Sequence, residues 1–140
     1  MAVHKVIGRS EDLAAVTMAG DGVQDVIKRV LVSPGEGWDG WVMRLFEIAP
    51  GGHTPRHTHP WPHLNFVASG AGELHLDGED YEIEAGSFAF VPADDEHQFR
   101  ATGSVPLSVG CIVPAEGDYS RFDTWHADRR PLGRFLPSHP

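Results

Sequence analysis

Apolar and polar residues alternate along most of this chain, and the alternation predicts short β-strands bounded by Gly, Pro and Asp. The dipeptide Asp77-Gly78 is a strong hairpin signal between two of these strands. The last strand has the clearest pattern, because its apolar residues share one parity and therefore one face: Val105, Leu107, Val109, Cys111 and Val113. The predicted strands are 23–32, 41–48, 64–68, 73–76, 81–84, 87–91, 97–100 and 105–113.

The pattern predicts little helix. The best helical candidate is 11–19, where the apolar period is weak. Short strands separated by turns are typical of a β-sandwich or β-barrel, so the sequence predicts an all-β, single-domain protein. Within it we expect an N-terminal segment at 1–22, a barrel at 23–114 and a C-terminal tail at 115–140 that packs on the barrel or is partly mobile.

Length, charge and cysteine content narrow the class of protein. A chain of 140 residues suits one domain, and its single cysteine, Cys111, excludes an intrachain disulfide. The net charge of −9 argues against a nucleic-acid partner, because phosphates require a basic surface. The sequence shows neither a signal segment nor an apolar run long enough for a membrane helix, so we expect a cytoplasmic protein with no membrane partner.

Histidines are numerous, with nine in the chain, and three of them fall between residues 57 and 63. His57 and His59 have the same parity and point the same way in an extended chain. His63 could join them after the turn at 60–62, and His97 could close the cluster from a neighbouring strand. Such a cluster would suit a metal ion, although histidines along a solvated strand edge would give the same spacing.

The spacing around these histidines resembles the two motifs of the cupin family. The first family motif is glycine, five residues, His-x-His, three or four residues, glutamate, six residues and glycine. Its positions here hold Gly51, His57, His59, His63 in place of the glutamate, and Gly70. The second motif keeps its spacing, but Asp94 replaces a glycine and Ala101 an asparagine: its positions hold Gly86, Pro92, Asp94, His97 and Ala101.

Histidine in the glutamate position is similar to a subgroup of small bacterial cupins that bind metal through four histidines. This resemblance implies a double-stranded β-helix (the cupin jelly-roll barrel), a homodimer, and one divalent ion held by His57, His59, His63 and His97. It also implies that the ion is manganese. Ligand chemistry alone would favour iron, copper, nickel or zinc, because manganese prefers oxygen ligands.

Three further residues are candidates for the wall of a cavity around the ion. Phe99 shares a face with His97, and Cys111 lies on the apolar face of the last predicted strand. Arg44 alternates with apolar neighbours and could hold an anionic substrate if its side of the strand faces the cavity. The alternatives are core packing for Phe99 and Cys111 and solvent exposure for Arg44. The remaining histidines are expected at the surface: His4, His53, His75, His126 and His139.

Four neutral imidazoles leave the double charge of an ion uncompensated, which favours an anionic small-molecule ligand. The resemblance implies a metal-dependent oxygenase or related oxidoreductase that cleaves a small organic substrate, with no catalytic residue assigned beyond the metal centre. A Lewis-acid isomerase or lyase is one alternative, and a non-catalytic binding domain is another. Oxygen consumption would separate the first hypothesis from the other two.

Overall fold

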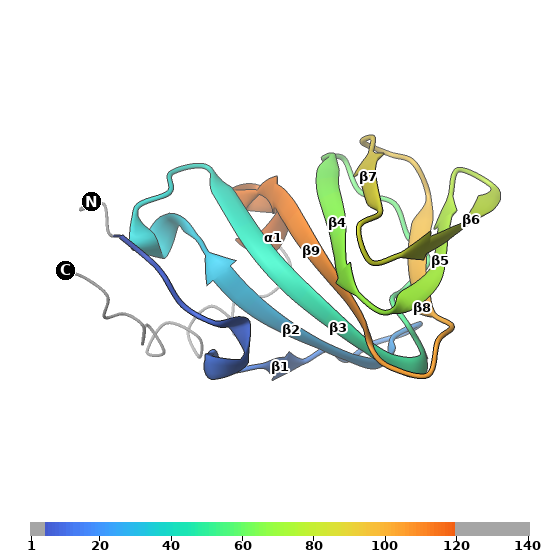
Figure 1. The fold of residues 1–140 in the computed structure, drawn as a ribbon. Coiled ribbons are helices and arrows are strands. Elements are labelled where there is room, and N and C mark those ends of the chain that lie inside the picture. The colour runs from blue at the N-terminus through green and yellow to red at the C-terminus, as the bar shows by residue number, and fades with distance from the viewer. Residues whose placement is uncertain (1–4, 120–140) are drawn as a thin grey trace.

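The computed structural model describes residues 5–119, which form a curled β-sheet with short helical turns at its margins (Figure 1). The strands are β1 (Val16–Thr17), β2 (Gln24–Val32), β3 (Trp41–His53), β4 (His63–Ser69), β5 (Ala71–Leu76), β6 (Glu79–Glu84), β7 (Phe88–Val91), β8 (His97–Ala101) and β9 (Leu107–Pro114). The helical segments are the 3-10 turns η1 (Ser10–Asp12) and η2 (Pro34–Glu36) and the α-helix α1 (Ala115–Tyr119). The predicted all-β fold is confirmed. In the described range no helix has the length and apolarity to cross a membrane.

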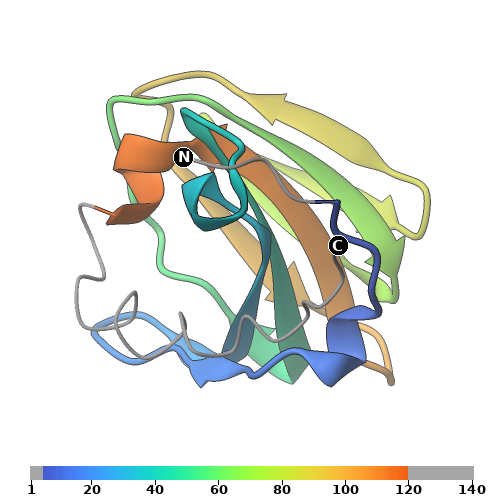
Figure 2. The ribbon, with the colours of Figure 1, turned by 90° about the vertical axis from the view of Figure 1, so that its left-hand side faces the viewer.

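Strand β3 is the centre of the sheet. The strand order is β6-β5-β8-β3-β9-β4-β7. Outside this order, β2 pairs with β3 and also with β1. Every neighbouring pair is antiparallel. The sheet curls around one interior, and α1 lies at one end of it beside the beginning of β3 (Figures 1 and 2). This is the jelly-roll barrel that the family resemblance implied.

The interior is built from the alternating residues of the strands. In β9 the residues Leu107, Val109, Cys111 and Val113 are buried, whereas Val105 precedes the strand and is exposed. Burial of each such aliphatic side chain stabilises the fold by about 1.5–3 kcal/mol. The main core cluster consists of Val26, Ile48, Val67, Leu74, Phe99, Ala101, Leu107 and Val109. The sequence pattern of the last strand therefore identified one wall of the core.

The turns form at the glycine and Asp-Gly positions that the sequence indicated. Asp77 and Gly78 both have positive φ, 49° and 87°, as a two-residue hairpin between β5 and β6 requires. At Gly70 the backbone passes so close to the segment before β9 that a Cβ atom would lie 2.2 Å from the carbonyl oxygen of Pro106. Only glycine fits this position, which is the last position of the first motif.

The largest differences from the structure concern two predicted elements. The helix expected at 11–19 is wrong: this segment contains only η1 and β1, and Val16 pairs with Lys28 of β2. Pairing with a long strand outweighs the weak helical period. Strand β3 also continues past residue 48 to His53. Gly51, at φ 84°, allows the irregular backbone there, and pairing with β2 resumes at His53 and Gln24.

The surface position expected for His75 is also wrong, because this residue is only 7 % exposed. Its Nδ1 lies 2.8 Å from Oδ1 of Asp80, and its Nε2 lies 3.4 Å from Oε1 of Glu96. Acidic side chains from two neighbouring segments thus cover this histidine. The predictions for His4, His126, His139 and residues 120–140 of the tail fall outside the described residues.

Candidate metal centre

Backbone hydrogen bonds join the two histidine motifs. The amide of His57 donates to the carbonyl of His97 at 3.2 Å, and the amide of His97 donates to the carbonyl of His57 at 3.0 Å. The amide of Asp94 donates to the carbonyl of His59 at 2.8 Å. Asp94 has φ 71°, so it keeps the left-handed turn for which the family motif uses glycine. These bonds hold the loop before β4 against the first residue of β8.

The four predicted ligands lie together. Ligand atoms of His57, His59 and His97 are all within 4.8 Å of one another. Nε2 of His63 lies 3.2 Å from Nε2 of His97. The ring of His97 is 4.8 Å, between centroids, from each of the other three rings. His97 is therefore the central member of the cluster.

Oxygen acceptors fix the orientation of three of the rings. The Nδ1–H groups of His59 and His97 donate to the carbonyl oxygens of Trp61 and Asp95, both at 2.9 Å. Nδ1 of His63 lies 2.7 Å from the side-chain oxygen of Asn65. Because these oxygens accept hydrogen bonds, each Nδ1 carries the proton and each Nε2 keeps a lone pair. This is the arrangement that metal-bound histidines adopt.

The donor set fits a divalent cation. Burial lowers the pKa of His63 to about 4, an effect that its hydrogen bond to Asn65 only partly offsets, so His63 is neutral at neutral pH. The lone pairs on Nε2 of His63 and His97 then face each other across 3.2 Å, an unfavourable arrangement without a positive charge near both. A divalent ion would accept both lone pairs. Neutral imidazoles suit first-row transition metals and zinc.

The cluster opens into a cavity of about 310 Å³. All four histidines line it, together with each of the three predicted wall residues, Arg44, Phe99 and Cys111. Apolar side chains from several strands make up much of the remaining wall: Val26, Phe46, Ile48 and Val109. The segment 18–21, within the expected N-terminal segment, also contributes. The cavity can therefore hold a small, largely apolar molecule beside the histidines.

Comparison with known proteins settles the family. The family model described as "Cupin domain" matches residues 44–113, which is half of the 140-residue chain. The chain belongs to the cupin family. This cupin is 28% identical over 113 residues to 1-methylthio-D-xylulose 5-phosphate methylsulfurylase of Rhodospirillum rubrum, covering 81% of this chain and 72% of the relative.

Solved structures agree with this assignment. The polyketide cyclase RemF from Streptomyces resistomycificus superposes on this cupin with a TM-score of 0.73 and 28% identity, over 79% of each chain. A cupin-2 domain from Rhodospirillum rubrum has a TM-score of 0.70 at 23% identity, over 83% of this chain and 78% of that one. The second likeness supports the fold alone.

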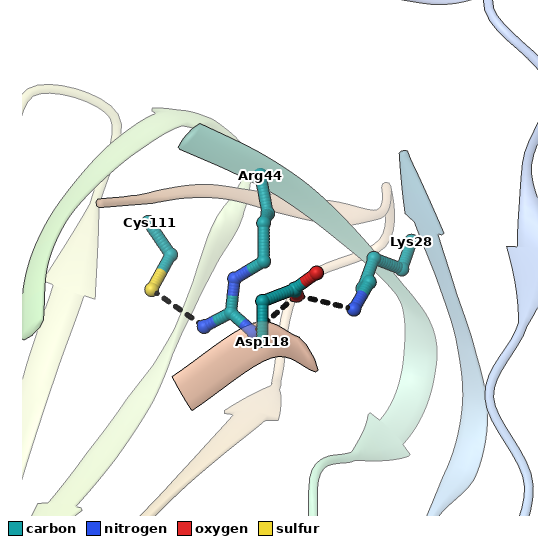
Figure 3. A network of polar contacts seen from close by, with 4 residues as sticks. All are labelled: Lys28, Arg44, Cys111 and Asp118. Carbon is teal, nitrogen blue, oxygen red and sulfur yellow. Dashed lines mark hydrogen bonds and ion pairs between the residues drawn. The ribbon is translucent and has the colours of Figure 1, made fainter. Parts of the chain in front are cut away.

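A buried charge network lies beside the cavity and was not expected from the sequence (Figure 3). Lys28 of β2 has no exposed surface, and its Nζ lies 2.7 Å from Oδ1 of Asp118 in α1. Nη1 of Arg44 lies 3.2 Å from the same oxygen, and Nη2 donates to Sγ of Cys111 at 3.0 Å. Burial lowers the pKa of Lys28 to about 8, and attraction to Asp118 offsets part of the shift. Lys28 shares parity with the buried Val26 and Val30, and this parity was the available sequence signal.

Proposed function

We propose that this cupin is a metal-dependent oxidoreductase that cleaves a small organic substrate, with one divalent ion held by His57, His59, His63 and His97. The observation that carries the proposal is the histidine cluster, whose possible ligand atoms lie close together at the wall of a mainly apolar cavity. By resemblance the ion is manganese, although the imidazole donors suit iron, copper, nickel or zinc as well.

The ion would supply a redox centre or a Lewis acid for a substrate oxygen. The protein does the rest. The Nδ1–H groups of His59 and His97 donate to backbone carbonyls, and that of His63 donates to the side-chain oxygen of Asn65. These hydrogen bonds hold the three rings in orientations that leave Nε2 available to the ion. The apolar wall, with Phe46, Ile48 and Phe99 among its members, would pack the carbon skeleton of the substrate and exclude water.

The composition of the cavity supports oxidative chemistry over proton-transfer chemistry. Among the described wall residues the one carboxylate is Asp21, which is exposed at the N-terminal segment. An isomerase or lyase needs a positioned acid or base near the reacting carbon. With the four histidines assigned to the ion, the exposed Asp21 and the thiol of Cys111 are the remaining candidate acids or bases on the described wall, so the cavity is better suited to a reaction in which the ion does the chemistry.

A second candidate is Lewis-acid catalysis without oxygen. It is favoured by the comparisons, because the two relatives at 28% identity are named as a polyketide cyclase and a methylsulfurylase, and neither name describes an oxygenase. In this case Cys111, which lines the cavity, would be the candidate for proton transfer.

Phenylpyruvate, an enolisable 2-oxo acid, separates the two candidates. Oxidative cleavage would consume one O₂ per molecule and release benzaldehyde and oxalate, whereas Lewis-acid catalysis would accelerate keto–enol exchange equally well under nitrogen. We expect the metal-loaded protein to consume oxygen with this acid or a close analogue. Faster exchange without oxygen uptake would favour the second candidate, and no turnover of any analogue would favour a binding domain.

We also propose that this cupin is a homodimer, as the family resemblance implies. The outer face of β4 and β7 supports the proposal, because cross-strand neighbours there are apolar and exposed: Leu64 opposite Phe90, and Phe66 opposite Phe88. Strand β7 lies at the end of the strand order, so a second copy could pack over this face.

The dimer proposal predicts that Phe66→Lys with Phe88→Lys yields a monomer in analytical ultracentrifugation, while the wild type sediments as a dimer. Charges placed on a buried interface are costly to desolvate. Tyr81→Lys, at an exposed site on β6, is the matched control and should stay dimeric. A monomeric wild type would contradict the proposal.

A further inference from the structure

The guanidinium group of Arg44 has more donors than acceptors around it. An arginine carries five N–H donors in a planar fork. Here Nη1 contacts Oδ1 of Asp118 and Nη2 contacts Sγ of Cys111, and a thiol is a weak acceptor. Nε is buried and has no hydrogen-bond partner among the described residues. The group therefore retains capacity for a strong acceptor.

Asp118 forms ion pairs with both Arg44 and Lys28. Its Oδ1 lies 2.7 Å from Nζ of Lys28 and 3.2 Å from Nη1 of Arg44, so the shorter contact is with the lysine. One carboxylate oxygen thus serves two cations, and Arg44 lacks the two-point pairing that guanidinium groups make with carboxylates. On its other side, the Cζ atom of Arg44 lies 4.9 Å from the centre of the Phe46 ring. These contacts hold the guanidinium in place, and its one carboxylate partner among the described residues, Asp118, is shared with Lys28.

The position of Arg44 relates it directly to the histidines. Arg44 of β3 pairs with Cys111 of β9, and Cys111 pairs with Asn65 of β4. The three residues form one row across adjacent strands and all line the cavity. Strands are about 4.8 Å apart, so the row spans about 10 Å. Asn65 bonds to His63, which lies on the same face two residues earlier. A small molecule that contacts the histidine cluster can therefore also contact Arg44.

We propose that Arg44 binds an oxyanion group of the substrate, a carboxylate or a phosphate, in the cavity that it shares with the histidine cluster. The proposal rests on the proposed function in that it names the substrate class for the same cavity. Arginine suits this task because its fork matches the geometry of carboxylate and phosphate oxygens. Lys28 and Asp118 lie outside the range 44–113 that matches the family model. The charge network around Arg44 therefore includes residues on both sides of the matched range.

Calorimetric titration of the metal-loaded protein with two probes tests the proposal. Benzoate carries a carboxylate and phenyl phosphate carries a phosphate, and both have a ring suited to the apolar wall. We expect at least one probe to bind, and we expect Arg44→Met to raise the Kd of that probe about tenfold or more, because a charge-assisted hydrogen bond is lost. Which probe binds more tightly identifies the kind of oxyanion.

The matched control is Arg100→Met, at an exposed position on β8, which should leave the Kd unchanged. The Arg44→Met variant is expected to fold, because Lys28 remains paired with Asp118. If it does not fold, Arg44→Lys decides: a Kd raised several-fold supports the proposal, because lysine keeps the charge without the fork, and an unchanged Kd contradicts it.

Metal content is measured in every variant, so that the two proposals can fail separately. A metal-loaded Arg44→Met protein that binds the probe as the wild type does would overturn the oxyanion site, because the probe would then be held by the ion or elsewhere. An equal rise in the Kd of the probe in Arg44→Met and Arg100→Met, or no binding of either probe to the wild type, would also overturn the proposed oxyanion site. If the wild type takes up no metal but binds the probe in a way that depends on Arg44, the result would contradict only the proposed function.

Discussion

Replacing His97 by alanine should abolish stoichiometric binding of a divalent ion to this cupin. The ring of His97 is next to each of the other three rings, and its Nε2 lies 3.2 Å from that of His63. Loss of a ligand should cost more than the 10- to 100-fold loss in affinity that is typical when a residue behind a ligand is changed. The Kd for the ion, measured by competition with a chelator, should rise by more than about 100-fold.

The same substitution should remove the stabilisation that the ion gives to the fold. A ligand that binds only the folded state raises the free energy of unfolding by RT ln(1 + [L]/Kd). The melting temperature of the wild type should therefore rise when metal is added, and that of His97→Ala should not. His75→Ala is the control, because His75 is buried outside the cavity wall and should leave the metal response intact. An undiminished response in His97→Ala would contradict the site.

Replacing Asp118 by alanine should destabilise the fold by about 3–5 kcal/mol, which is the usual cost of removing one partner of a buried ion pair. Lys28 has no exposed surface and Arg44 has little, and both contact the same oxygen of Asp118. Without that carboxylate, two cations remain in the interior. Urea unfolding of the two proteins measures the difference. Glu116→Ala, at an exposed site on the same helix, should change stability by less than about 0.5 kcal/mol.

The deficit of Asp118→Ala should be larger at pH 6 than at pH 9. Burial already lowers the pKa of Lys28 to about 8 from 10.5, and losing Asp118 removes the attraction that opposes this shift. A lysine whose pKa is lower in the folded state binds fewer protons there than in the unfolded state, so stability rises with pH between the two values. Adding Lys28→Met should restore much of the loss at pH 6. A deficit that is the same at both pH values would contradict the role of Lys28.

The strands were predictable because burial has a period of two. The parity of Leu107, Val109, Cys111 and Val113 identified the inner face of β9, and Asp77-Gly78 located a hairpin. The helix predicted at 11–19 failed because pairing of Val16 with Lys28 joins residues that are not close in sequence. The continuation of β3 past Gly51 depends in the same way on pairing between His53 and Gln24.

The histidine cluster was suggested by spacing, since His57 and His59 share a parity and the family motifs gave His63 and His97 their places. The orientation of the rings was not predictable. It depends on carbonyl groups such as that of Asp95, whose direction is set by the folded turn. The Lys28–Asp118 pair joins residues 90 positions apart, and only the folded barrel brings α1 beside β2. His75 likewise becomes buried through contacts with Asp80 and Glu96, which the strand pattern could not show.

A crystal structure of the protein grown with manganese, with anomalous-difference density measured at the manganese edge, tests the central claim most directly. The account predicts one ion per chain, in contact with Nε2 of His57, His59, His63 and His97, at distances near the roughly 2.0–2.2 Å typical of metal–imidazole bonds. No ion at the cluster, with iron and zinc tested in the same way, would contradict the account. An ion held elsewhere in the chain would contradict it equally.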